Sequence, residues 1–210
     1  MAVTGLDKVF VVNAETNTKY GGVDSTGEFV TINELVPQPY KVYTALLAQS
    51  GGDNPDSISG DGGTLDIGYT YVISSNPDNY DLTIYGAPNN DSGTYFTCTN
   101  SVLALPYTDS LDIGINYGAP VVTVLENTIG NVWWTWQGKG LFWANSDSLF
   151  TRDKTLAFIS QSTASERDVP VTAYTYGFGR NSVEIETYGS INEKSDGVLN
   201  KTPIEIRVYN

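Results

Sequence analysis

The sequence predicts an all-β protein built around an antiparallel β-sandwich of the jelly-roll or immunoglobulin-like kind. Apolar and polar residues alternate with a period of two along much of the chain, β-branched and aromatic residues are abundant, and helical periodicity is almost absent. Glycine, asparagine and aspartate gather between the alternating runs, where they favour tight turns. Many short strands joined by such turns are typical of sandwiches.

The clearest predicted strand covers residues 202–209, where isoleucine and valine alternate with Glu205, Arg207 and Tyr209. The same pattern predicts a strand over 182–188 with Tyr188 on its outward side. We expect Tyr188 and Tyr209 to contribute to a protein–protein interface, because tyrosine provides contact area at a small entropic cost. Further strands are expected over 8–13, 41–48, 69–74, 121–125, 132–137, 141–144 and 156–160.

Two short motifs each occur twice, and their copies bracket the middle of the chain: Leu-Asp-Ile-Gly at 65–68 and 111–114, and Gly-Ala-Pro at 86–88 and 118–120. The residues between them are rich in Asn, Asp, Gly and Tyr, and a stiff Pro-Gln-Pro sequence ends the first part of the chain. We therefore expect three parts: an extended N-terminal segment over 1–39, a discontinuous sandwich over 40–58 and 118–210, and an inserted small β module over 59–117.

Composition excludes several classes of function. The 210 residues contain no histidine and one cysteine, so Ser-His-Asp triads, Cys-His dyads and histidine general bases are excluded. We expect Cys98 to be a buried small hydrophobe, because it shares a strand face with Phe96. A net charge of −13 argues against binding to nucleic acid or to anionic membranes. Neither a signal peptide nor an apolar run of about 18 residues is recognisable, so no membrane insertion is expected.

Three segments carry a resemblance to known proteins: KVYTALLAQSG at 41–51, APVVTVLENTIG at 119–130 and TPIEIRVY at 202–209. Together they resemble a β-rich family of tailed-phage virion proteins that is common among phages of Bacteroidetes hosts. In that family the first segment can run directly into the second, which agrees with an insertion between them here. The insert contains GYTYVI, GAPN and GTYFT, and resembles a small β motif recurrent in phage structural proteins. That motif usually closes with Ala-Thr-Gly, whereas this chain has Cys98-Thr99-Asn100.

The resemblance implies a non-enzymatic virion protein, synthesised in the host cytoplasm and placed on the particle as a head fibre, a capsid decoration or a tail protein. Its role would be particle assembly or surface adhesion. The partners implied are other virion proteins and further copies of the chain, with a trimer favoured among homo-oligomers. The N-terminal segment 1–39 would be a region of attachment to the virion, an expectation that rests on its position.

The tryptophans suggest an alternative function. They fall in VWWTW at 132–136 and LFW at 141–143, which we expect to form a hairpin. Alternation places Trp133 on one face with Thr135 and Gln137, away from Trp134 and Trp136. An exposed ring beside polar groups could bind host surface glycans, which would make the protein a carbohydrate-binding host-recognition module. The competing interpretation is that these rings are buried in a core or in a subunit interface.

Acidic residues suggest two further sites. Asp53, Asp56 and Asp61 lie in a glycine-rich loop, where their oxygen ligands could bind calcium. The spacing does not match an EF-hand, and aspartates in loops commonly form Asx turns instead, as could the second group around Asp78. Glu184 and Glu186 share a strand face about 7 Å apart, which suits a carboxylate-only glycoside hydrolase as the remotest alternative. Charges that alternate on an outward face are more simply explained as solvated surface.

Overall fold

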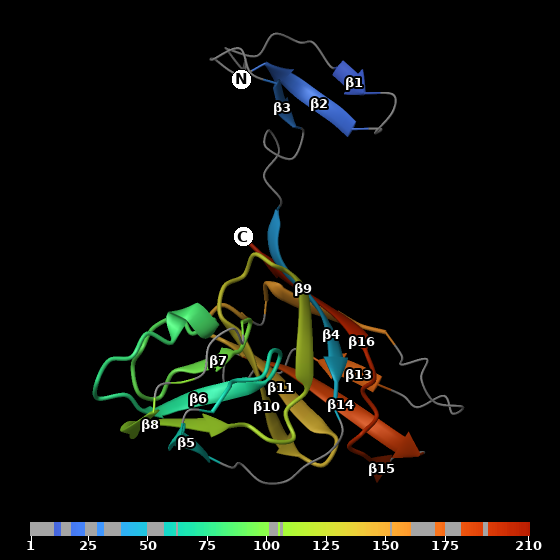
Figure 1. Ribbon diagram of the computed structural model, residues 1–210. Coiled ribbons are helices and arrows are strands. Elements are labelled where there is room, and N and C mark those ends of the chain that lie inside the picture. Colours follow the sequence, from blue (N-terminus) through green and yellow to red (C-terminus); the bar gives the residue numbers. More distant parts are fainter. Residues whose placement is uncertain are drawn as a thin grey trace. The chain divides into compact units, whose positions relative to one another are not determined.

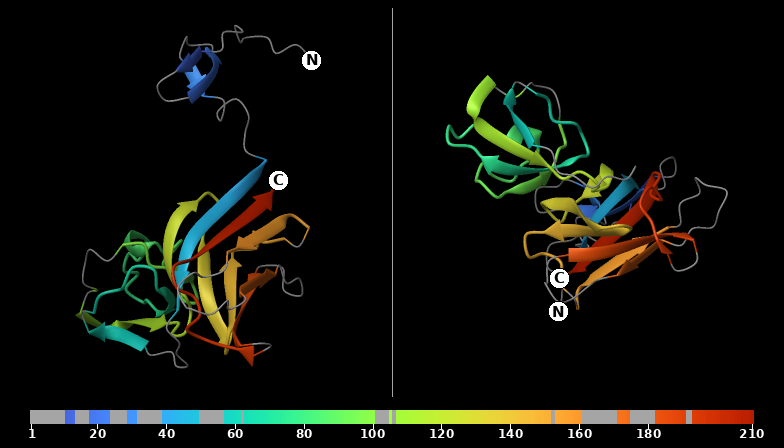
Figure 2. Two further views of the ribbon diagram at one scale, coloured as in Figure 1. Left: turned by 90° about the vertical axis from the view of Figure 1, so that its right-hand side faces the viewer. Right: turned by 90° about the horizontal axis from the view of Figure 1, so that it is seen from below.

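The computed structural model describes residues 11–13, 18–23, 29–31, 39–49, 57–61, 63–100, 105, 107–151, 153–160, 171–174, 182–190 and 193–210 (Figures 1 and 2). The described residues form strands and one short 3-10 turn, η1 (Thr83–Tyr85), so the predicted all-β fold class is confirmed. The chain divides into two compact units, Met1–Tyr40 and Lys41–Asn210.

The N-terminal unit contains a three-stranded antiparallel sheet in the order β1-β2-β3. Its strands are β1 (Val11–Asn13), β2 (Thr18–Val23) and β3 (Phe29–Thr31). The strand expected over 8–13 corresponds to β1, with residues 8–10 outside the described part. Strands β2 and β3 were not expected. The adjacent glycines in β2 interrupt its alternation, and β3 has only three residues.

Two antiparallel sheets of the second unit form a β-sandwich (Figure 1). The first sheet has the order β12-β16-β4-β9, and its strands are β12 (Thr155–Ile159), β16 (Thr202–Tyr209), β4 (Tyr40–Ala48) and β9 (Val121–Asn127). The second sheet has the order β10-β11-β14-β13, and β15 pairs with β14. Its strands are β10 (Val132–Gly138), β11 (Leu141–Ser146), β14 (Ser182–Ser190), β13 (Val171–Tyr174) and β15 (Glu193–Lys194).

Alternate residues of both sheets point into a shared hydrophobic core. The inward sides expected for β14 and β16 are observed: Val183, Ile185, Ile204 and Ile206 are buried, and Val208 is half-buried against the same core. The buried members of this core are Tyr43, Ala45, Leu47, Ala119, Val122, Ile129, Val132, Trp134, Phe142, Ala144, Phe150, Val183, Ile185, Leu199, Ile204 and Ile206.

Trp134 lies at the centre of this core, and its polar atom is satisfied across the sandwich. Its indole Nε1 donates a hydrogen bond to the Tyr43 hydroxyl at 3.2 Å, which joins the second sheet to the first. Both side chains have 0% exposure. Burial raises the pKa of Tyr43 far above its usual range, against a small opposing effect of the hydrogen bond from Trp134, so the hydroxyl remains neutral.

The inserted module has a sheet and a core of its own. Its sheet has the order β5-β8-β6-β7, formed by β5 (Ser57–Asp61), β8 (Tyr107–Ile115), β6 (Thr70–Ser75) and β7 (Tyr95–Thr97). Its strands begin at Ser57, two residues before the expected boundary of the insert. The buried residues of this core extend from Leu65 to Ile115 and include Cys98, whose thiol has a pKa raised chiefly by burial. Cys98 is therefore a buried small side chain, as expected.

The insert packs against the edges of both sandwich sheets on the side where β9 and β10 lie (Figures 1 and 2). Thr70 Oγ1 accepts a hydrogen bond from the backbone N–H of Trp134 at 3.2 Å, and Thr97 Oγ1 donates to the carbonyl of Val132 at 3.1 Å. The backbone N–H of Val122 donates to the carbonyl of Gly68 at 2.9 Å. These bonds satisfy backbone groups that terminal strands would otherwise leave unpaired.

Strand β8 was not predicted from the sequence pattern. Its segment YTDSLDIGI contains Asp, Ser and Gly, which are poor strand formers, and part of it was interpreted as a motif at a module boundary. In the structure Leu111, Ile113 and Ile115 are buried in the core of the insert. The alternation was present, but packing against β5 and β6 rather than local propensity determines this strand.

Replacing Tyr43 with Phe should lower the free energy of unfolding by about 1–3 kcal/mol, because the buried indole N–H of Trp134 loses its acceptor. Urea unfolding at neutral pH measures the change. The control is Tyr95→Phe, at a residue that is 36% exposed, which should change stability by less than about 0.5 kcal/mol. Equal stability of the two variants would contradict the expected contribution of the Trp134–Tyr43 bond.

Replacing Gly68 with Ala should destabilise the protein more than replacing Gly93 with Ala. Both glycines have φ +87°, which costs a residue with a Cβ about 1–2 kcal/mol. A Cβ at Gly68 would lie 2.5 Å from the carbonyl oxygen of Val122, whereas one at Gly93 would have no neighbour within 4 Å. The difference between the two urea-unfolding free energies isolates the close contact between insert and sandwich. Equal losses would mean that this contact relaxes without cost.

Candidate functional site

Two outward surfaces of the sandwich are candidates for function, one on each sheet. The surface of the second sheet contains the residues that the sequence suggested as a ligand site. Trp133, Thr135 and Gln137 lie along β10, and the register places Asn145 opposite Trp133 and Trp143 opposite Thr135. Trp143 in turn lies opposite Glu184 of β14. We call this surface the polar-aromatic face: Trp133, Thr135, Gln137, Trp143, Asn145 and Glu184.

The polar atoms of the polar-aromatic face bind one another. Thr135 Oγ1 accepts hydrogen bonds from Gln137 Nε2 at 2.8 Å and from Asn145 Nδ2 at 3.0 Å. The indole Nε1 of Trp143 donates to Glu184 Oε2 at 3.2 Å. The sheet therefore holds these groups in fixed positions, and a ligand would have to compete with existing bonds for them.

Trp133 is half-buried, and its ring stacks on Tyr95 of the insert with a centroid distance of 6.1 Å and an interplanar angle of 16°. Trp134 is buried and Trp136 packs against the core, so the tryptophans occupy the expected faces. Trp143 also lies on this surface, although it was not expected there. A hairpin with a three-residue turn pairs positions 135 and 143, so the register of the predicted hairpin could have placed Trp143 beside Thr135.

The two glutamates considered for glycoside hydrolysis have different partners. Glu184 accepts the bond from Trp143, while Glu186 forms an ion pair with Lys194 at 2.5 Å and accepts a short hydrogen bond from the Tyr188 hydroxyl. Burial alone would raise the pKa of Glu186, but Lys194 and Tyr188 outweigh it, so the pKa is lowered. Glu186 thus remains ionised at neutral pH, whereas the general acid of a glycosidase needs a raised pKa.

The structure does not bring the two proposed interface tyrosines together. Tyr188 lies on β14 of the second sheet and Tyr209 on β16 of the first sheet, and both are half-buried. The Tyr188 hydroxyl is bound to Glu186, and the backbone N–H of Tyr209 donates to the carbonyl of Lys154 at 2.8 Å. They therefore belong to separate surfaces.

The proposed calcium ligands fall mostly outside the described residues. Asp53 and Asp56 lie there, and of Asp61 the structure describes the backbone at the end of β5. In the second acidic group, Asp81 accepts a hydrogen bond from the backbone of Thr83 at 3.0 Å, which is a turn-forming role. Among the described residues no group of three or more acidic or cysteine side chains is arranged to hold a metal ion. Calcium binding in the 53–61 loop stays a prediction.

The surface of the first sheet is apolar and was not expected from the sequence. Large side chains are exposed along it: Leu125 at 62%, Leu156 at 49% and Phe158 at 51%. The register between β4 and β9 shifts between Thr44 and Ala45, so Leu125 is the extra residue of a β-bulge. Leu125 and Phe158 lie on the two terminal strands, with β4 and β16 between them.

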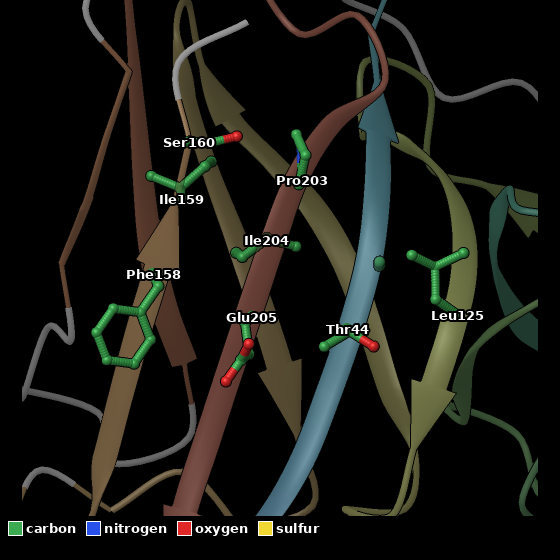
Figure 3. Close-up of a pocket in the computed structure, with 9 residues that line it drawn as sticks. Thr44, Leu125, Phe158, Ile159, Ser160, Pro203, Ile204 and Glu205 are labelled. Carbon is green, nitrogen blue, oxygen red and sulfur yellow. The ribbon is translucent and has the colours of Figure 1, made fainter. Parts of the chain in front are cut away.

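A hollow of about 380 Å³ occupies this surface (Figure 3). Figure 3 shows Leu125 on one side, Phe158 on the other, and Thr44, Pro203 and Glu205 between them. We call this surface the apolar face, defined by the outward residues Thr44, Leu125, Leu156, Phe158, Ser160, Pro203 and Glu205. Ala45, Ile159 and Ile204 complete the lining of the hollow from the core side.

The charges beside the hollow neutralise each other. Arg207 and Glu205 form a short ion pair on β16, and the Arg207 guanidinium lies 5.3 Å from the centroid of the Phe158 ring. A cation over an aromatic ring adds an attractive contact and covers part of that ring. The centre of the apolar face therefore carries little net charge, although the chain as a whole carries −13.

Comparisons with protein-family models, with curated proteins and with solved structures find no match. Within the described residues there is no helix with the length and apolar character needed to cross a membrane.

Replacing Lys194 with Met should raise the pKa of Glu186 towards its ordinary value of 4.5, because the carboxylate loses its cation. A lowered pKa in the folded state stabilises the protein above the pKa of the unfolded chain, and this contribution disappears as the pH falls through the folded-state value. The wild type should therefore exceed Lys194→Met in stability near pH 7, and the difference should shrink in acid. Carboxyl ¹³C titration and urea unfolding at several pH values measure both effects.

Lys139→Met is the matched control, since Lys139 and Glu193 form an exposed pair at 3.7 Å. Such pairs contribute about 0–1 kcal/mol, and this substitution should leave the titration of Glu186 unchanged. A stability difference for Lys194→Met that is independent of pH would contradict the assigned ion pair.

Proposed function

We propose that the protein is a non-enzymatic structural component of a tailed-phage virion that acts in particle assembly through its apolar face. The observation that carries the proposal is the exposure of Leu125, Leu156 and Phe158 on one side of a single sheet. Scattered apolar residues are normal on protein surfaces, but a group of large ones around a hollow is typical of interaction sites.

The composition of the apolar face is that of an interface core. Such cores are enriched in aromatic residues and Arg, and free charges are depleted there. Phe158 lies against Arg207, whose charge is paired with Glu205. The hollow between Leu125 and Phe158 has room for an apolar side chain of a partner, which is how anchoring residues bind at interfaces.

The resemblance to virion proteins supports the same surface. Its three segments, 41–51, 119–130 and 202–209, contain strands β4, β9 and β16. These strands are neighbours in the first sheet, although long stretches of sequence separate them. Three of the four strands of the sheet that presents the apolar face thus lie in segments that resemble phage virion proteins, while β12 lies outside them.

Binding of host glycans by the polar-aromatic face has less support. The ring of Trp133 is stacked on Tyr95, and the polar atoms near Trp143 already bind one another. The apolar face, in contrast, exposes large apolar side chains to solvent. Assembly is therefore the better supported of the two functions.

The protein should be present at a fixed copy number in purified particles from infected cells, as measured by quantitative mass spectrometry. Replacing Leu125 with Lys should reduce its incorporation about tenfold or more, because burying a leucine contributes about 1.5–3 kcal/mol. Gln137→Lys is the control: it makes the same substitution at an exposed residue of the polar-aromatic face and should leave incorporation unchanged. Abundant chain in the lysate and none in purified particles would refute the virion function.

A further inference from the structure

Strand β12 is a terminal strand of the first sheet, and one side of its backbone is unpaired among the described residues. Its other side pairs with β16: the Tyr209 N–H donates to the Lys154 carbonyl at 2.8 Å, and the Ser160 N–H to the Pro203 carbonyl at 3.2 Å. In an antiparallel ladder every second residue bonds to the same neighbour, so the even-numbered residues of β12 direct their backbone groups toward β16. The backbone N–H and C=O of Thr155, Ala157 and Ile159 therefore point away from β16.

The sequence of β12 contains none of the residue types that usually protect a terminal strand. Its sequence, TLAFI, contains no charged residue and no proline. Leu156 and Phe158 are exposed beside it on the apolar face. On the opposite side of the sandwich the insert satisfies backbone groups of the terminal strands β9 and β10. Among the described residues the insert thus covers one pair of edges, while the outer edge of β12 has no backbone hydrogen bond and lies near β13 of the second sheet.

The charge distribution favours a second copy of the chain as the occupant of this edge. Two chains of −13 repel each other, and they approach at the lowest cost where each is uncharged. Strand β12 is uncharged, and the neighbouring Glu205 and Arg207 are paired. An acidic or basic partner segment would find no opposite charge within Thr155–Ile159, since the nearest charged residues of the same chain segment, Asp153 and Lys154, precede the strand.

The strand is also complementary to itself in antiparallel orientation. If Ala157 faces Ala157 of the second copy, then Thr155 faces Ile159, and these three pairs can exchange about six main-chain hydrogen bonds. Leu156 then lies opposite Phe158 of the second copy on the apolar face, at the close spacing of a non-hydrogen-bonded pair. In this single register the outward backbone groups of β12 form hydrogen bonds with the second copy, and its exposed side chains Leu156 and Phe158 contact those of the second copy.

We propose that β12 pairs with β12 of a second copy, so that the two first sheets join into one continuous sheet around a two-fold axis. This inference rests on the proposed assembly function and names the partner of one edge of the apolar face. The hollow lies between Phe158 of β12 and Leu125 of β9, so its Leu125 side remains available to another virion protein when β12 is paired. The pairing differs from the trimer that the sequence analysis favoured.

The test is the mass of the full chain in solution, by sedimentation equilibrium and by light scattering after size exclusion. A short strand interface is smaller than a standard one, so we expect association at about micromolar concentrations. The expected mass is twice the chain mass of 22.8 kDa. Raising the salt concentration should strengthen the dimer, because salt screens the repulsion between the two acidic chains.

Two variants address the pairing directly. Ala157→Pro removes an N–H that points away from β16, so the existing ladder is retained while the intermolecular one is interrupted. Phe158→Lys places a charge on the shared apolar surface without changing the backbone. Each should weaken dimerisation about tenfold or more. Leu125→Lys is the matched control, since it adds the same charge on the same face at the opposite terminal strand, and it should still dimerise.

Hydrogen exchange gives an independent readout. The amides of Thr155, Ala157 and Ile159 should become protected as the concentration of wild-type chain rises, while Phe158→Lys should remain unprotected there. A monomer at all concentrations, a stable trimer, or a dimer that persists in both β12 variants would overturn the pairing. The outcome is separable from that of the proposed function: a monomeric chain whose incorporation into particles still depends on Leu125 would refute the pairing alone.

Discussion

The position of Trp134 is the constraint on which the rest of this structure depends. A tryptophan that is fully buried must satisfy its indole N–H, and here the acceptor is the Tyr43 hydroxyl of the opposite sheet. The backbone N–H of the same residue is bound by Thr70 of the insert. One residue therefore fixes the separation of the two sheets and also the place where the inserted module attaches. Because every partner is buried, each unmade bond would carry the full cost of desolvation.

The attachment of the insert determines which surfaces remain for binding. The insert binds backbone groups of β9 and β10, the terminal strands on one side of the sandwich, through Gly68, Thr70 and Thr97. A terminal strand that is already satisfied in this way has little to offer a partner. Strand β12 lies at the other end of the first sheet, where its outer backbone groups have no partner among the described residues. The edge at β12 is thus the end of the first sheet that the insert does not cover.

The two outward faces of the sandwich differ for a physical reason that concerns their side chains. On the second sheet the hydroxyl, amide, indole and carboxylate groups of Thr135, Asn145, Trp143 and Glu184 satisfy one another, which gives a rigid surface with few free groups. On the first sheet Leu125 is exposed, and Phe158 remains half exposed although Arg207 lies over part of its ring. Exposed apolar area lowers the free energy of association when it is covered, whereas polar groups that are already paired contribute little. This contrast is the reason for assigning assembly to the first sheet.

The sequence by itself determined the all-β class, most strands of the sandwich and the inward side of β14 and β16, because these follow from the alternation of apolar and polar residues within a strand. It also placed Trp133 away from Trp134. It did not give β8, whose Asp, Ser and Gly residues disguise the alternation of Leu111, Ile113 and Ile115. The sequence did not predict the apolar face either. Leu125 is exposed by a bulge, and it lies on the same face as Phe158 only because strands distant in sequence share one sheet. Alternation is a local property that one strand encodes alone. Which strands become neighbours, and which of their edges the insert covers, depends on contacts between distant segments and was decided by the tertiary structure.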